Sequence, residues 1–303
     1  MVREAVAFME QHKQEPFFLN YWSYSVHSPF EAKPEWVQKY KARVHSSNPQ
    51  RSPVYAGMIQ SFDEAVGALL DALDRLELNE RTIVVFFSDN GGSTYDRIQG
   101  VPATSNAPLR GGKGQIYEGG IRVPAVVIWP GRIEPGSRSE ALLSSTDWYP
   151  TLLEMLEIEK PREHLVDGVS QVSALLGNES PRSSIYSYLP HYFPLPGTVP
   201  ATSLRKGDWK LIRFHHDAPD QSDRFELYDL ASDLAERHNL ADAHPDRVLR
   251  MDREIADYLR EIGALVPMRN PAYTPAAVSP RRPPAQDASS LDASSSTGLP
   301  NPN

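Results

Sequence analysis

The chain has 303 residues, no cysteine and a formal net charge of −8 at pH 7. Without cysteine it has no disulfide, no thiolate zinc site and no cysteine nucleophile. The acidic balance offers no basic stripe to a phosphate backbone, which argues against a nucleic-acid partner, and no apolar run of about 18 residues predicts a membrane span.

The first half of the chain alternates segments of strand and helix character. Residues 16–24 are short, apolar and aromatic, which predicts a buried strand. Apolar residues recur at intervals of three and four over 53–76, which predicts the clearest helix of the chain. Segments 82–89 and 123–131 predict two further strands, and the hydrophobicity of 82–89 is typical of a parallel strand covered on both faces. This alternation favours an α/β fold.

The second half has a different character. Two strand candidates, 208–214 and 225–230, are joined by polar turns and predict a smaller antiparallel sheet, against which an amphipathic helix at 246–263 should pack. From Pro271 onward Pro, Ser and Ala dominate, so we expect disorder. We divide the chain into an α/β domain at 1–175, a small α+β subdomain at 176–268 and a disordered tail at 269–303.

Polar residues follow these strands where a ligand is expected. Asp89 and Asn90 end the strand at 82–89, His27 follows the first strand, and Lys113 lies in a glycine-rich segment that leads into the third. Carboxylate and amide oxygens favour calcium or magnesium over zinc, although "DNGG" also suits a simple turn. A lone lysine or histidine often has only a structural role. Together the four residues indicate an anion-plus-metal site.

Several motifs in the same order resemble those of the sulfatase family, within the alkaline-phosphatase-like superfamily. They are "HSPF", "FFSDNGG", "LRGGKGQIYEGGIRVPAVVIWPG", "RKGDWKLIRF" and "LYDLASDLAERHNLA", and they span residues 17–240. The resemblance implies that Asp89 and Asn90 bind one calcium ion, in preference to magnesium, and that Lys113 and His27 hold the sulfate. His191, in "YSYLPHYFP", is similar to a histidine that faces the substrate in related enzymes.

The resemblance also implies a fold and an activity. The expected fold is a partial alkaline-phosphatase-like sandwich, with a mainly parallel sheet flanked by helices and a smaller antiparallel sheet carrying a packed helix. The expected activity is hydrolysis of sulfate esters of aryl or carbohydrate substrates. An intact bacterial relative would be periplasmic or secreted.

One part of the family's machinery is missing from its usual place. Sulfatases use a formylglycine, made from the Cys or Ser of a C/S-x-P-x-R motif, whose hydrate attacks sulfur before elimination regenerates the aldehyde. In the family this motif and two metal-binding aspartates lie well before "HSPF", but here only 26 residues precede His27. "SNPQR", from Ser47, fits the letters but follows His27 in a polar loop, so we do not expect it to supply the nucleophile. We expect a gene fragment or a degenerate paralogue that hydrolyses sulfate esters poorly or not at all.

Two other functions remain open. A phosphatase or phosphonate hydrolase of the same superfamily would commonly hold two zinc ions with Asp and His clusters. Here Asn90, and no histidine, follows Asp89, which favours a sulfatase. A non-catalytic protein that binds sulfated glycans is the alternative from a different class.

Overall fold

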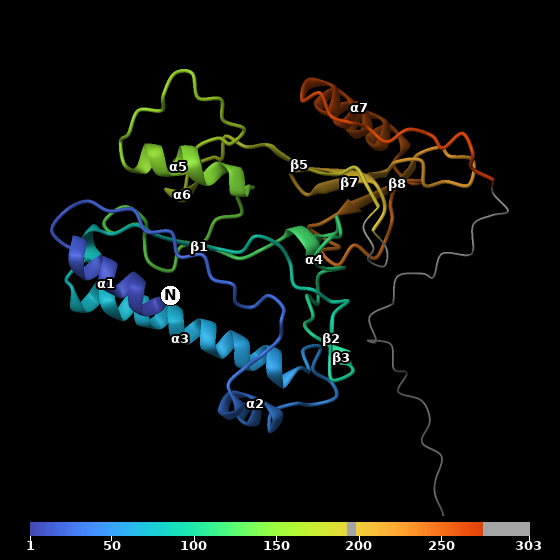
Figure 1. Cartoon of the computed structure of the whole chain (residues 1–303). Helices are drawn as coiled ribbons and strands as arrows, with labels where there is room; N and C mark the ends of the chain where they lie inside the picture. Colours follow the sequence, from blue (N-terminus) through green and yellow to red (C-terminus); the bar gives the residue numbers. More distant parts are fainter. Residues whose placement is uncertain (193–197, 275–303) are drawn as a thin grey trace, which may run out of the picture.

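The computed structural model of the chain describes residues 1–192 and 198–274. A larger N-terminal part packs helices around a short strand pair, and a smaller part is a four-stranded sheet covered by one helix (Figure 1). The α/β class and the smaller antiparallel sheet with its helix agree with the sequence analysis. Most of the tail that we predicted to be disordered, residues 275–303, lies outside the described residues.

The N-terminal part is built on a long helix. Its helices are α1 (Val2–His12), α2 (Pro34–Lys41) and α3 (Pro53–Arg75). Ser52 caps α3, because its hydroxyl accepts a hydrogen bond of 3.2 Å from the backbone N–H of Tyr55. The apolar face of α3 places Leu73 in a buried cluster with Met9 of α1. The helix predicted over 53–76 is confirmed.

The strands that follow α3 form a two-stranded ladder. Strand β1 (Val84–Phe87) pairs with β4 (Ala125–Ile128) in antiparallel register, with Val84 opposite Ile128. The prediction of a parallel strand at 82–89 is therefore wrong, because continuous hydrophobicity reports burial and not strand direction. The predicted strand at 16–24 is also wrong, since this segment makes no ladder among the described residues.

The N-terminal part leaves apolar side chains uncovered by the described residues. Trp22 is 79% exposed, Tyr24 86% and Val126 of β4 55%. Each of these side chains leaves apolar area open to a further segment. None of the helices in residues 1–192 and 198–274 combines the length and apolarity needed to cross a membrane.

The remaining elements before the smaller sheet are short. They are η1 (Asn79–Arg81), β2 (Arg97–Ile98), β3 (Val101–Pro102), α4 (Glu118–Ile121), η2 (Ser145–Asp147), α5 (Trp148–Met155) and α6 (Val172–Leu175).

The smaller part is an antiparallel sheet with the strand order β5-β6-β7-β8. Its elements are β5 (Ser184–Leu189), β6 (Ala201–Lys206), β7 (Trp209–Phe214), β8 (Arg224–Asp229) and the helix α7 (Pro245–Glu261). The predicted strands at 208–214 and 225–230 and the predicted helix at 246–263 are confirmed. Strands β5 and β6 were missed, because several of their inward-facing residues, such as Thr202, are polar.

The two faces of this sheet bury different partners. On one face Leu204 and Leu211 pack against α7, where Ile255 is fully buried. On the other face Ile212 packs against Tyr117, just before α4. The sheet therefore lies between α7 and the glycine-rich segment that carries Lys113 (Figure 1).

Candidate active site

The loop after β1 presents two oxygen-bearing side chains. Asp89 is exposed, and its Oδ1 accepts a hydrogen bond of 2.9 Å from the backbone N–H of Asn90. The Asn90 amide donates from Nδ2 to the carbonyl of Gly91 at 2.9 Å. Asp89 Oδ2 and Asn90 Oδ1 have no hydrogen bond within the described residues, so one oxygen of each side chain remains for a ligand. The loop is thus both a turn and a candidate cation site.

The structure brings His27 and Lys113 together. Lys113 Nζ lies 2.8 Å from His27 Nε2, although 86 residues separate the two along the chain. His27 Nδ1 lies 2.9 Å from the carbonyl oxygen of Ser28. A flexible lysine in a glycine-rich loop is therefore held against an imidazole whose other nitrogen is fixed by the backbone. This arrangement suits an oxyanion, because both side chains end at the same exposed point.

Asn106 joins the two loops of the site and was missed in the sequence. Its Oδ1 accepts from the N–H of Gly92 at 3.0 Å, and its Nδ2 donates to the carbonyls of Gly92 at 2.9 Å and Gly111 at 3.0 Å. The Gly92 carbonyl also accepts from the N–H of Lys113 at 3.1 Å. One carboxamide thus ties the Asp89 loop to the Lys113 loop. Nothing in the sequence distinguishes it from an ordinary loop asparagine.

Glycines allow these loops to touch. A Cβ on Gly91 would lie 1.8 Å from the carbonyl oxygen of Gly119, and a Cβ on Gly120 would lie 2.0 Å from the carbonyl oxygen of Gln115. The Gly91 N–H donates to the Gly120 carbonyl at 3.0 Å. Any other residue at these positions would push the two backbone segments apart. Gly91 in "DNGG" and Gly120 in "EGG" are therefore needed for packing.

A buried ion cluster anchors the glycine-rich segment to the smaller sheet. Lys210 Nζ lies 3.0 Å from Glu118 Oε1 and 2.8 Å from Glu236 Oε1, and all three side chains are almost fully buried. The Glu118 N–H also donates to Glu236 Oε2 at 2.7 Å. Burial raises the pKa of Glu236, and Lys210 opposes that rise. The cluster fixes α4, five residues after Lys113, on the sheet.

The side-chain oxygens of Asp89 and Asn90 are of the type that a hard cation prefers, but they are too few to coordinate one. Within residues 1–192 and 198–274 no three His, Cys, Asp or Glu side chains come together as a metal site. The described residues therefore lack the Asp and His clusters of a two-zinc phosphatase. Two oxygens are fewer than the roughly six to eight that calcium takes.

Two other residues singled out in the sequence lie apart from this cluster. His191 is exposed, and it makes no hydrogen bond with His27 or Lys113 within the described chain. Ser47 is exposed, and its hydroxyl contacts His45 Nδ1 at 2.7 Å. Among the described residues no hydrogen bond links Ser47 to Lys113 or Asp89.

Comparison with known proteins gives the class. The Sulfatase family model matches residues 1–158, and the model for the C-terminal region of N-sulphoglucosamine sulphohydrolase matches residues 112–262. The chain therefore belongs to the sulfatase family, whose members are sulfuric ester hydrolases.

Particular relatives support this assignment. N-acetylgalactosamine-6-O-sulfatase of Bacteroides thetaiotaomicron is 30% identical over 281 residues, covering 86% of this chain and 50% of that protein. Human arylsulfatase A is 34% identical over 247 residues, covering 76% of this chain and 45% of that protein. The crystal structure of Ps i-CgsB superposes with a TM-score of 0.72 at 28% identity, covering 85% of this chain and 53% of that one. The chain thus spans about half the length of these relatives.

Proposed function

We propose that this chain forms the sulfate-binding part of a carbohydrate sulfatase active site, with Lys113 and His27 holding the sulfate. The observation that carries the proposal is the 2.8 Å contact between Lys113 Nζ and His27 Nε2. Lys113 would turn its positive charge to the sulfuryl oxygens, and His27, released from its contact with Lys113, would carry its proton on Nε2 and donate to the same oxygens. Such groups stabilise the charge that develops on those oxygens during ester cleavage.

The metal of this site is proposed to be calcium. Asp89 and Asn90 would hold it through one oxygen each, and both are hard ligands of the kind calcium prefers over zinc. When bound, the ion would add positive charge that helps to stabilise the sulfuryl oxygens. Calcium is favoured over magnesium because its coordination is more flexible, which suits ligands from a loop.

We further propose that the nucleophile and the remaining metal ligands come from residues outside those described. Two observations support this: the oxygen donors are too few, and the apolar side chains of Trp22, Tyr24 and Val126 are uncovered. A formylglycine-bearing segment packed on that surface would cover them and complete the site. The chain alone would then bind sulfate esters and turn them over poorly or not at all.

The substrate is proposed to be a sulfated carbohydrate. One relative is named as an N-acetylgalactosamine-6-O-sulfatase, and Ps i-CgsB was also solved in complex with k-i-k-neocarrahexaose. His191 is proposed to contact the sugar, since it is exposed and follows β5 by two residues. A periplasmic or secreted location would accord with such a substrate.

Binding and turnover by the purified chain test these proposals. Calcium should strengthen binding of a sulfated saccharide, and Lys113→Ala should weaken this binding about tenfold or more, whereas the exposed-lysine control Lys39→Ala should not. Unchanged binding in Lys113→Ala would refute the role given to Lys113. Efficient turnover by the chain alone would refute the proposal that the nucleophile lies elsewhere.

The incomplete donor set also favours a second candidate, a protein that binds sulfated glycans without catalysis. To separate the two, the chain is mixed with a purified segment that carries a relative's formylglycine motif. Calcium-dependent turnover that Lys113→Ala abolishes would support the sulfatase. Binding without turnover in that mixture would support the glycan-binding protein.

A further inference from the structure

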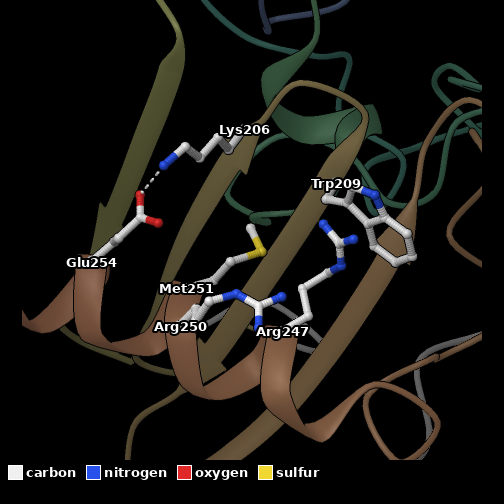
Figure 2. Close-up of a pocket in the computed structure, with 6 residues that line it drawn as sticks. All are labelled: Lys206, Trp209, Arg247, Arg250, Met251 and Glu254. Carbon is white, nitrogen blue, oxygen red and sulfur yellow. Dashed lines mark hydrogen bonds and ion pairs between the residues drawn. The ribbon is translucent and has the colours of Figure 1, made fainter.

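A small basic pocket lies between α7 and the β6–β7 hairpin. Its volume is about 190 Å³. Figure 2 shows that its walls come from the strands on one side and the helix on the other. The lining residues are Lys206, Trp209, Arg247, Arg250, Met251 and Glu254.

The sequence builds this pocket from two regular patterns. Arg247, Arg250, Met251 and Glu254 are separated by three, four and seven positions, which places them on one face of α7. Lys206 and Trp209 lie opposite each other where β6 and β7 meet. Gly207, with a φ of +58°, closes the turn between them. The pocket is therefore a product of the fold and not of an irregular loop.

Positive charge dominates the lining. Lys206 Nζ pairs with Glu254 at 2.7 Å, and the Arg247 guanidinium stacks on the Trp209 ring, 4.0 Å from its centroid (Figure 2). Stacking uses the face of the guanidinium and leaves its N–H edge available. Arg250 is exposed and has no partner among the described residues. Three cations thus face one carboxylate, in a chain whose net charge is −8.

The pocket is separate from the candidate active site. Met251 belongs to the cluster that α7 forms on one face of the sheet, whereas the segment that follows Lys113 packs on the other face through Tyr117. The sheet therefore stands between the two sites (Figure 1). A small sulfate ester held by Lys113 cannot also fill the pocket.

We propose that this pocket is a second binding site that holds a sulfate group of an extended sulfated saccharide. The edges of Arg247 and Arg250 offer paired N–H donors of the kind that bind tetrahedral oxyanions, and Met251 and Trp209 offer an apolar wall to the C–H groups of a sugar ring. The choice of a saccharide rests on the proposed function. The choice of a sulfate-type anion rests on the pocket itself. Such a site would keep a polymeric substrate on the protein between cleavage events.

The test compares variants of the full chain by calorimetric binding of a sulfated hexasaccharide. The double variant Arg247→Ala/Arg250→Ala should bind about tenfold more weakly or worse, and its binding should depend less on salt. Arg253→Ala is the matched control, because Arg253 is an exposed arginine of α7 outside the pocket, and it should bind normally. Unchanged affinity in the double variant, or an equal loss in Arg253→Ala, would overturn the proposal.

Four further measurements identify the ligand and control for misfolding. The desulfated hexasaccharide should not bind, and inorganic sulfate should compete poorly; equal competition by inorganic sulfate would show a simple oxyanion site and refute the saccharide. Arg250→Ala alone should weaken binding even if loss of the Arg247 stack disturbs the fold. When Lys113→Ala is already present, the two arginine substitutions should still weaken binding of the hexasaccharide further. If only the Lys113 substitution weakens binding, this inference fails and the proposed function stands. If only the arginine substitutions weaken binding, the proposed function fails and this inference stands.

Discussion

Lys113 Nζ and His27 Nε2 lie 2.8 Å apart, and this contact favours one tautomer of the imidazole. An ammonium group only donates hydrogen bonds, so Nε2 must be the acceptor. On the other side of the ring, Nδ1 faces the carbonyl oxygen of Ser28 at 2.9 Å, and a carbonyl only accepts. The imidazole tautomer that satisfies both contacts carries its proton on Nδ1.

This tautomer can be observed directly. We expect the ¹⁵N NMR spectrum at neutral pH to show a protonated Nδ1 and an unprotonated Nε2 for His27. Lys113→Met should remove the donor to Nε2 and shift the ring toward the Nε2–H form, whereas Lys33→Met, an exposed lysine paired with Glu64, should not. An Nε2–H form in the unchanged protein would contradict the contact.

Asn106 should matter more than its position in a loop indicates. Asn106→Ala removes three hydrogen bonds to backbone groups of Gly92 and Gly111, so we expect a loss of about 2–4 kcal/mol in the free energy of unfolding. Sulfate binding at Lys113 should weaken as well, because the two loops separate. Asn79→Ala, which removes one exposed bond to Asp74, should cost less than about 0.5 kcal/mol. Equal denaturation midpoints for the two variants would show that Asn106 does not hold the loops.

The parts of the fold that the sequence predicted are those with a clear local period. The helices at 53–76 and 246–263 each carry an apolar face. The strands at 208–214 and 225–230 are short apolar segments separated by polar turns. The strand prediction for segment 16–24 was wrong because an apolar, aromatic composition is typical of a buried strand. In the structure Trp22 and Tyr24 are exposed among the described residues. Apolar composition alone does not say what covers a segment.

The site was predicted in part for the same reason. Short motifs marked His27 and Lys113, and the structure joins them. Asn106 acts through contacts with Gly92, 14 positions away, and Gly111, five positions away, and Lys210 through one with Glu118, 92 positions away. No helical or strand period marks such residues. Lys210 occupies a buried strand position where an apolar residue would be expected. Its partner Glu118 lies 92 residues away, so the sequence around Lys210 does not reveal the pairing.

Lys210 should be needed for stability. Lys210→Met would leave the buried carboxylate of Glu236 without a cation among the described residues, and Glu118 with only Arg122 at 3.5 Å and Arg205 at 3.7 Å. We therefore expect a loss of about 3–5 kcal/mol in the free energy of unfolding. The exposed-pair control Lys33→Met should lose less than about 1 kcal/mol. The loss in Lys210→Met should shrink as the pH falls, because burial raises the pKa of Glu236 and protonation then neutralises this carboxylate. A loss that does not change with pH would contradict this reading.

His215 should make stability depend on pH below neutrality. Burial lowers the pKa of His215 from 6.5 to about 4, with Arg213 acting in the same direction. Between these values the unfolded chain takes up a proton that the folded chain does not. The His215 contribution is therefore full above pH 6.5, falls as the pH drops toward about 4, and is then constant, for a total of about 3 kcal/mol.

His215→Gln keeps a polar group near Thr202, whose hydroxyl lies 2.8 Å from Nε2, but it cannot titrate. Urea unfolding of both proteins across this range should show the difference in unfolding free energy changing by that amount. Parallel curves would mean that the buried imidazole does not set the acid limit of the fold.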